Sequence, residues 1–225
     1  MINFDEQLDF FKLIGNELKE RIIGYVIGGS AMMFYGAKVN TKDVDLVFLS
    51  RKELEQIKDV LFNIGFEEKK KMIKIFKRYD IADNKPIMME GKDTRFDLFL
   101  NEIIDFKMTE SIVNRVKESH EFNNLIIKVV SPEDIILLKS ATEREKDRLD
   151  ALNLLKKFDI NWSIIIEESI HQTKIGELLF PVFLYDFLYE LKEDLKADIP
   201  KKVLDEIRKI SEDILIKKLK KKKKK

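Results

Sequence analysis

With 225 residues, 44% of them hydrophobic, the chain can bury a substantial core and does not have the composition of a disordered protein. It contains no cysteine, which excludes disulfides and cysteine-ligated zinc. Its two histidines, His120 and His171, lie far apart in sequence and give little support to a histidine metal site or a Ser-His-Asp triad. No apolar run reaches the roughly 18 residues of a membrane-spanning helix, so we expect a cytoplasmic protein without a membrane partner.

The N-terminal part mixes helical and strand patterns. Apolar residues at helical spacing predict a first helix over residues 4–21, ended by Gly24. A short buried strand over 25–27, a helix over 30–35 and a second strand over 44–48 follow. Helices and strands therefore alternate from the start of the chain.

Further elements continue this mixed pattern. Ser50 and Glu53 have the spacing of a capping box and predict a helix that continues through Asn63. Beyond it, the pattern indicates one or two strands within 66–78, a strand over 94–100, a helix over 109–118 and a strand over 125–130. We expect an α+β fold in which a mixed β-sheet is flanked by helices.

The C-terminal part changes character at Ser131-Pro132, which is typical of a helix N-cap followed by proline at the first helical position. We expect a catalytic portion over 1–130, a helical portion over 131–216 and a disordered basic tail over 217–225. The tail holds eight lysines and leaves the rest of the chain with a net charge of about −7, against +1 overall. Its two interpretations are a solvated end and a nonspecific, salt-sensitive attraction to nucleic acid.

Two aspartates stand one residue apart in the second predicted strand. On a strand, alternate side chains share a face, so Asp43 and Asp45 point the same way while Val44 and Leu46 point into the core. Carboxylates on one face repel unless a cation lies between them, and Mg²⁺ prefers such oxygen ligands. Asp97 has the same setting in a later strand, and if the strands are neighbours the three carboxylates converge, enough to hold two metal ions about 4 Å apart.

A glycine pair and a serine precede these aspartates. Gly28, Gly29 and Ser30 follow a strand and open a helix, where glycine lets the backbone approach a ligand and the helix offers unpaired N–H groups. This combination favours a phosphate cradle. It is neither a Walker loop, because no Gly-Lys-Ser/Thr follows at the required spacing, nor a dinucleotide fingerprint.

This order of motifs resembles the nucleotidyltransferase superfamily, which has the DNA polymerase β-like catalytic fold. The match covers about residues 24–100 and consists of Gly29, Ser30, Asp43, Asp45 and Asp97. The resemblance implies that Gly28, Gly29, Ser30 and Lys42 hold the phosphates of a nucleotide. It also implies that Asp43 and Asp45 bind Mg²⁺, and that Asp97 shares a metal ion and helps to deprotonate an acceptor hydroxyl.

A second stretch, residues 129–155, resembles the abortive-infection group of nucleotidyltransferase toxins and their relatives. There, a lysine near a helix end precedes an Arg-x-Lys-Asp-x-x-Asp group, here Lys139 followed by Arg144, Lys146, Asp147 and Asp150. The resemblance implies that Lys139 and Arg144 bind the triphosphate and that Asp147 orients one of them or meets the acceptor. That group often has an arginine two residues before the threonine of Thr-Lys-Asp-x-Asp. At this position the chain has Val39, with Lys38 one residue earlier.

The resemblance implies a Mg²⁺-dependent enzyme, with two ions, that transfers a nucleoside monophosphate from an NTP to a hydroxyl and releases pyrophosphate. The nucleotide is expected between the two portions, with Lys139 facing the aspartates. Three acceptors stay open: an RNA such as a tRNA end, a small hydroxylated molecule, and a protein hydroxyl. A toxin role would require an antitoxin-like partner. The alternative is a catalytically silent module that binds a nucleotide or a partner.

Each motif also has a structural interpretation. Asp43 and Asp45 are also compatible with a solvated edge strand, and Asp97 with a simple ion pair to Arg95 or to a lysine. The residues from Lys139 to Asp150 are compatible with an exposed, charged helix face stabilised by i,i+3 pairs. For the catalytic interpretation, Asp97 must lie on the sheet beside the other two aspartates.

Overall fold

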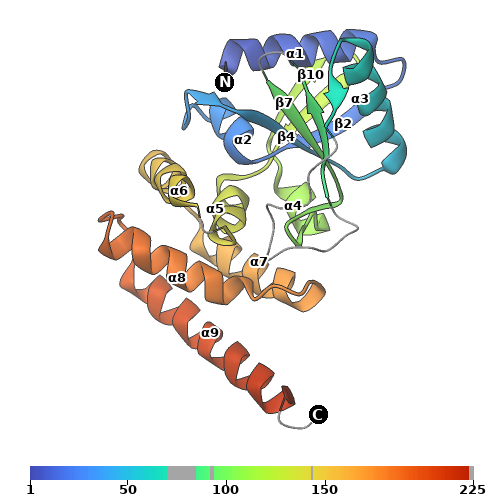
Figure 1. The fold of residues 1–225 in the computed structure, drawn as a ribbon. Helices are drawn as coiled ribbons and strands as arrows, with labels where there is room; N and C mark the ends of the chain where they lie inside the picture. The colour runs from blue at the N-terminus through green and yellow to red at the C-terminus, as the bar shows by residue number, and fades with distance from the viewer. Residues whose placement is uncertain (70–84, 92–93, 143, 223–225) are drawn as a thin grey trace. The chain divides into compact units, whose positions relative to one another are not determined.

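The structure is a computed structural model that describes residues 1–69, 85–91, 94–142 and 144–222 (Figure 1). The chain divides into two compact units, Met1–Ser131 and Pro132–Lys225. The first unit contains all of the described strands, and the second is helical throughout its described elements.

The first unit is built on a mixed sheet whose described strands have the order β10-β11-β2-β4-β7-β6-β5. The β11–β2 and β4–β7 pairs are parallel, and the remaining neighbours are antiparallel. The strands are β2 (Ile22–Val26), β4 (Asp43–Phe48), β5 (Glu67–Glu68), β6 (Ile87–Glu90), β7 (Arg95–Leu100), β10 (Glu118–Phe122) and β11 (Leu125–Val129). Two short pairs stand apart from this sheet: β1 (Ile2–Asn3) with β3 (Asn40–Thr41), and β8 (Glu102–Ile103) with β9 (Phe106–Lys107).

Four described helices belong to the first unit: α1 (Phe4–Glu17), α2 (Gly28–Phe34), α3 (Arg51–Asn63) and α4 (Glu110–Arg115). Helix α1 begins at a capping box in which the Asn3 side chain accepts from the Glu6 backbone and Glu6 accepts from the Asn3 backbone. Near its other end, a Cβ added to Gly15 would lie 1.7 Å from the Phe122 carbonyl oxygen. Only glycine therefore allows α1 to approach the β10–β11 turn this closely.

Alternation along β4 and β7 separates a core face from a polar face. Val44, Leu46 and Phe96 are fully buried, and the Phe96 ring meets the rings of Phe10 at 5.8 Å and Phe66 at 5.4 Å between centroids. Phe10 lies on α1, and both α1 and α3 pack on the sheet and on each other, so they cover this core face (Figure 1). The aspartates of these strands occupy alternate positions and belong to the opposite face.

The second unit contains α5 (Pro132–Ser140), α6 (Glu145–Lys157), α7 (Trp162–Ile175), α8 (Phe180–Glu193) and α9 (Lys201–Lys222). One stripe of α8 contributes five almost fully buried residues to the core of this unit: Phe180, Leu184, Phe187, Leu188 and Leu191. Such i, i+4, i+7, i+8 and i+11 spacing places these side chains on one face of the helix. Across the described residues, no helix has the length and apolar character needed to span a bilayer.

The α+β fold with a central mixed sheet and a helical C-terminal part is confirmed, whereas several element boundaries are not. Helix α1 ends at Glu17, and Gly24 lies inside β2 instead of ending a helix. The helix expected over 109–118 stops at Arg115, and β10 follows. This strand was not predicted because its sequence, Glu-Ser-His-Glu-Phe, is polar, and its pairing depends on a turn with Asn123 at φ 53°.

Two further predicted segments lie partly outside the residues that the structure describes. Of the strands expected within 66–78, the structure shows β5, and residues 70–78 lie outside the described residues. The tail expected to be disordered continues α9 as far as Lys222, while residues 223–225 also lie outside the described part. Lysine is a good helix former, and no glycine or proline interrupts this stretch, which explains the continuation.

Candidate functional site

The parallel neighbours β4 and β7 bring the three predicted aspartates onto one face of the sheet. In their register, Asp45 is opposite Asp97 and Asp43 is opposite Arg95. Because residues two apart on a strand share a face, all four side chains belong to the same side. The condition set by the sequence, that Asp97 lies on the sheet beside Asp43 and Asp45, is therefore met.

A guanidinium group lies between two of these carboxylates. Arg95 Nη2 donates to Asp43 Oδ2 and, at 2.9 Å, to Asp97 Oδ2, while Arg95 Nε lies 2.8 Å from Asp97 Oδ1. Burial opposes the charge of Arg95, but Asp97 and Asp43 outweigh it and raise the Arg95 pKa above its ordinary value. The ion pair between Asp97 and Arg95 is thus confirmed, and it coexists with the placement of the three aspartates on one face of the sheet.

The carboxylate oxygens of the three aspartates are ligands that a hard divalent cation prefers, but they are not arranged as a complete metal site. Within the described residues, no three His, Cys, Asp or Glu side chains stand together as a ready metal site. However, oxygens of Asp43 and Asp97 contact the same cationic nitrogen, so two strands already present carboxylates to one shared positive charge. In this structure the Arg95 guanidinium supplies that charge.

The glycine pair packs directly against the third carboxylate. Gly28 has φ +59°, and an added Cβ would lie 2.9 Å from Asp45 Oδ2. At Gly29, an added Cβ would lie 2.9 Å from Thr41 Oγ1 and 3.4 Å from Lys38 Cε. A side chain would collide with Asp45 at the first position and with Thr41 at the second, so both positions require glycine and the backbone lies close to these polar side chains.

Lys38 was not among the residues that we assigned to the nucleotide. Its aliphatic chain passes over Gly29, which brings a cationic side chain to the glycine pair. The sequence signal was indirect, because Lys38 is next to Val39, the position where the resembling toxins often have arginine. Lys42, which we did assign, is exposed immediately before β4.

Ser30 faces the interior of the first unit. It is fully buried, its hydroxyl donates to Gln7 Oε1, and Gln7 Nε2 donates to the Ser30 carbonyl oxygen at 3.4 Å. Gln7 is itself fully buried on α1. In this arrangement Ser30 ties the start of α2 to α1, and a direct hydroxyl contact with phosphate would require the bond to Gln7 to break.

In the second unit, the predicted lysine and aspartates form a buried charged cluster. Lys139 Nζ donates to Asp147 Oδ1 at 2.7 Å and to Asp150 Oδ2 at 2.6 Å, and its side chain is only 6% exposed. Asp147 also accepts from the Thr142 hydroxyl and from Arg144 Nε at 2.7 Å. The exposed helix face that we considered for these residues is therefore wrong for Lys139, Asp147 and Asp150, and holds for Lys146.

The protonation of Asp147 follows from these contacts. Burial acts to raise its pKa, but the charge and hydrogen bond of Lys139, the Thr142 hydroxyl and Arg144 together lower the pKa below its ordinary value. Asp147 is thus held ionised inside the unit. The Arg144 side chain, 60% exposed, is the member of this cluster that solvent reaches most easily.

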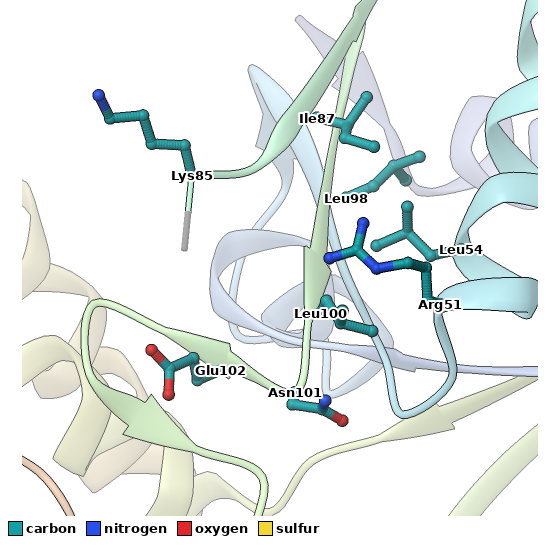
Figure 2. A pocket seen from close by; sticks show the side chains of 8 residues that line it. All are labelled: Arg51, Leu54, Lys85, Ile87, Leu98, Leu100, Asn101 and Glu102. Atoms are coloured by element: carbon teal, nitrogen blue, oxygen red, sulfur yellow. The ribbon is translucent and has the colours of Figure 1, made fainter. Parts of the chain in front are cut away.

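A separate cavity of about 270 Å³ lies on the first unit, at the end of β7 next to α3 (Figure 2). Leu98 and Leu100 line it from β7, on the face opposite Asp97. None of the predicted site residues lines it. Its remaining lining residues are Arg51, Leu54, Lys85, Ile87, Asn101 and Glu102.

A mixed sheet whose two parallel neighbouring strands carry Asp-x-Asp and a third aspartate, beside a glycine pair, defines a nucleotidyltransferase-like protein. The chain belongs to the family described as nucleotidyl transferase of unknown function (DUF2204), whose model matches residues 7–223. The resemblance inferred from residues 24–100 is thereby confirmed at the level of the family. No curated protein matches the chain significantly in sequence.

Two crystal structures illustrate what the chain is similar to. JHP933 from Helicobacter pylori is 15% identical over 95% of this chain and 96% of that chain, with a TM-score of 0.43. An antigenic nucleotidyltransferase-like protein from Paracoccidioides brasiliensis is 16% identical over 90% of this chain and 98% of that chain, with a TM-score of 0.49. At such identities and scores, neither structure assigns a substrate or an activity to this chain.

Proposed function

We propose that the chain is a metal-dependent enzyme that transfers a nucleoside monophosphate from an NTP to an acceptor hydroxyl. The observation that supports this proposal most strongly is the register of β4 and β7, which sets Asp97 opposite Asp45 with Asp43 on the same face. The bond from the acceptor oxygen to the α-phosphorus forms, the bond from that phosphorus to the bridging oxygen breaks, and pyrophosphate leaves with the electron pair.

The three aspartates would share one task in this reaction, and Asp97 would have a second. Asp43, Asp45 and Asp97 would hold Mg²⁺, which neutralises phosphate charge and lowers the pKa of the acceptor hydroxyl when bound. Asp97, 11% exposed and thus partly shielded from water, would also accept the hydroxyl proton. Positioning of the two reactants and neutralisation of their charge would supply most of the rate enhancement.

The phosphates would lie along the glycine pair. Gly28 and Gly29 carry no side chain to keep a phosphate from their backbone, and Lys38 and Lys42 would add positive charge beside them. Ser30 would act through its bond to Gln7, by fixing the start of α2. Of the second unit's residues assigned to the triphosphate, the exposed Arg144 is the one we propose as a ligand, whereas the buried Lys139 would act through Asp147, which accepts from both.

The test is incubation of the protein with each labelled NTP, Mg²⁺ and a pool of RNA and small-molecule acceptors. We expect label transfer and pyrophosphate release, and a loss of about 100-fold or more in Asp43→Asn and Asp45→Asn because each removes a charge that acts in the transition state. Asp9→Asn is the matched control, since Asp9 is an exposed residue paired with Lys12 on α1. Equal rates for wild type and both site variants would refute the enzymatic proposal.

For the acceptor we favour RNA, such as a tRNA end, because the chain ends in a strongly basic segment. Removing residues 217–225 should then weaken RNA binding strongly at low salt and little at high salt. An unchanged affinity would show that residues 217–225 do not bind RNA. A toxin role would in addition require an antitoxin-like partner, for which co-purification from the native host is the test.

The second candidate function is a catalytically silent module that binds a nucleotide or a partner protein. The Arg95 guanidinium favours it, because this group contacts both Asp43 and Asp97 and neutralises their charge. NTP binding that is unaffected by Mg²⁺, with no label transfer and no effect of Asp45→Asn, would support this function over the enzymatic one.

A further inference from the structure

The acidic face of the first unit has its own positive charge. Asp43 and Asp97 come from adjacent strands, and without a cation their like charges would repel in a partly buried setting. Arg95 prevents this by contacting both, through Nη2 on each carboxylate and Nε on Asp97. The planar guanidinium suits this double contact, which a lysine ammonium would make less specifically.

The position of Arg95 on β7 follows from the strand itself. Arg95 is opposite Asp43 in the parallel register and two residues before Asp97, so its side chain is obliged to share the face of the carboxylates. Its side chain is 32% exposed, against 11% for Asp97. The Arg95 side chain is therefore partly open to solvent, although its Nε is buried against Asp97.

We propose that Arg95 is a displaceable internal counter-ion, which neutralises Asp43 and Asp97 in the metal-free protein and is expelled when a divalent cation binds there. The inference rests on the proposed function, because it takes these aspartates as metal ligands. A divalent cation and the guanidinium compete for the same oxygens and repel each other, so both cannot occupy the site at full contact. Arg95 consequently weakens the affinity for metal and protects the empty site from self-repulsion.

Two measurable properties of the metal-free protein follow. Removing the charge of Arg95 leaves two carboxylates facing each other, so the protein without metal becomes less stable. The same change removes the competitor, so a divalent cation binds more tightly. A residue that merely ties β7 to β4 would reduce stability and leave the metal affinity unchanged or lower.

The test measures Mn²⁺ binding by electron paramagnetic resonance, with Mn²⁺ alone as the probe and no nucleotide. We expect Arg95→Gln to bind Mn²⁺ about tenfold more tightly than wild type, which corresponds to about 1.4 kcal/mol. Arg95→Lys should fall between the two, because it keeps the charge but loses the forked contact. Arg21→Gln is the control, since Arg21 is an exposed arginine of the same unit, paired with Glu121.

The outcomes separate this inference from the proposed function. If wild type binds Mn²⁺ and Arg95→Gln binds it equally or more weakly, the counter-ion role is overturned while the metal site stands. If neither protein binds Mn²⁺ at millimolar concentration, the metal site and the counter-ion role both fail. Should Arg95→Gln not fold by circular dichroism, Arg95→Lys takes its place, and tighter Mn²⁺ binding than in wild type remains the required result.

Discussion

Replacing Lys139 by methionine removes the cation that two buried carboxylates share in the second unit. Lys139 Nζ contacts Asp147 and Asp150 at 2.7 and 2.6 Å, and the Asp147 side chain is fully buried. Removing one partner of a buried ion pair costs about 3–5 kcal/mol, because a charge is left without compensation. Asp147 keeps its bonds to Arg144 and Thr142, so we expect a loss at the lower end, about 3 kcal/mol.

The assay is urea unfolding at several pH values, and the direction of the pH effect is fixed by Asp147. Its folded pKa lies below the ordinary value of 3.8, so its contribution to stability is present above that value and is lost as pH falls through the lowered pKa. In Lys139→Met the main cause of the lowering is gone, and Asp147 takes up a proton more readily. The stability difference between variant and wild type should therefore narrow as the pH is lowered toward 4.

Lys146→Met is the matched control, because Lys146 is an exposed lysine on the same helix as both aspartates. It should change stability by no more than about 0.5 kcal/mol. A loss below about 1 kcal/mol for Lys139→Met at pH 7, with no dependence on pH, would contradict the buried cluster and its energetics.

Two glycine substitutions test close approaches in the first unit. Gly15→Ala should destabilise the protein by about 3 kcal/mol or more, because its Cβ would lie 1.7 Å from the Phe122 carbonyl oxygen. In the control Gly65→Ala the added Cβ meets nothing within 4 Å, so the loss of stability should be only about 1 kcal/mol, caused by the positive φ. Equal losses of stability in thermal unfolding would contradict this packing. Gly28→Ala should push Asp45 aside and weaken Mn²⁺ binding several-fold by electron paramagnetic resonance, and unchanged affinity would show that the glycine does not shape the site.

The strand periodicity in the sequence was enough to predict which face the aspartates share. Apolar residues alternate with Asp43 and Asp45 in one strand and with Asp97 in the other, and alternation fixes the face of every residue once a strand is assumed. The register between the strands was beyond this reasoning. The sequence of either strand alone does not determine that Asp45 lies opposite Asp97, because that pairing depends on how the whole sheet assembles.

Contacts between distant segments account for what the sequence did not reveal. Whether the Ser30 hydroxyl faces phosphate or the core is decided by Gln7, which is 23 residues earlier in the chain. The exposed or buried state of Lys139 was equally open, since a lysine at a helix end is usually solvated. Conversely, Arg95 was considered only as an alternative to a site shared by the aspartates, whereas in the structure it links Asp43 and Asp97 on the face that all three share.

The place of β2 in the sheet has a consequence for biosynthesis. This strand, made of residues 22–26, is flanked on one side by β4 and on the other by β11, which ends at Val129. As the polypeptide leaves the ribosome, one edge of β2 has no sheet partner until about one hundred further residues have emerged. A nascent chain stalled before Leu125 should thus expose one unpaired edge of an apolar strand and depend on chaperones, whereas one that has released Val129 can pair β2 on both edges.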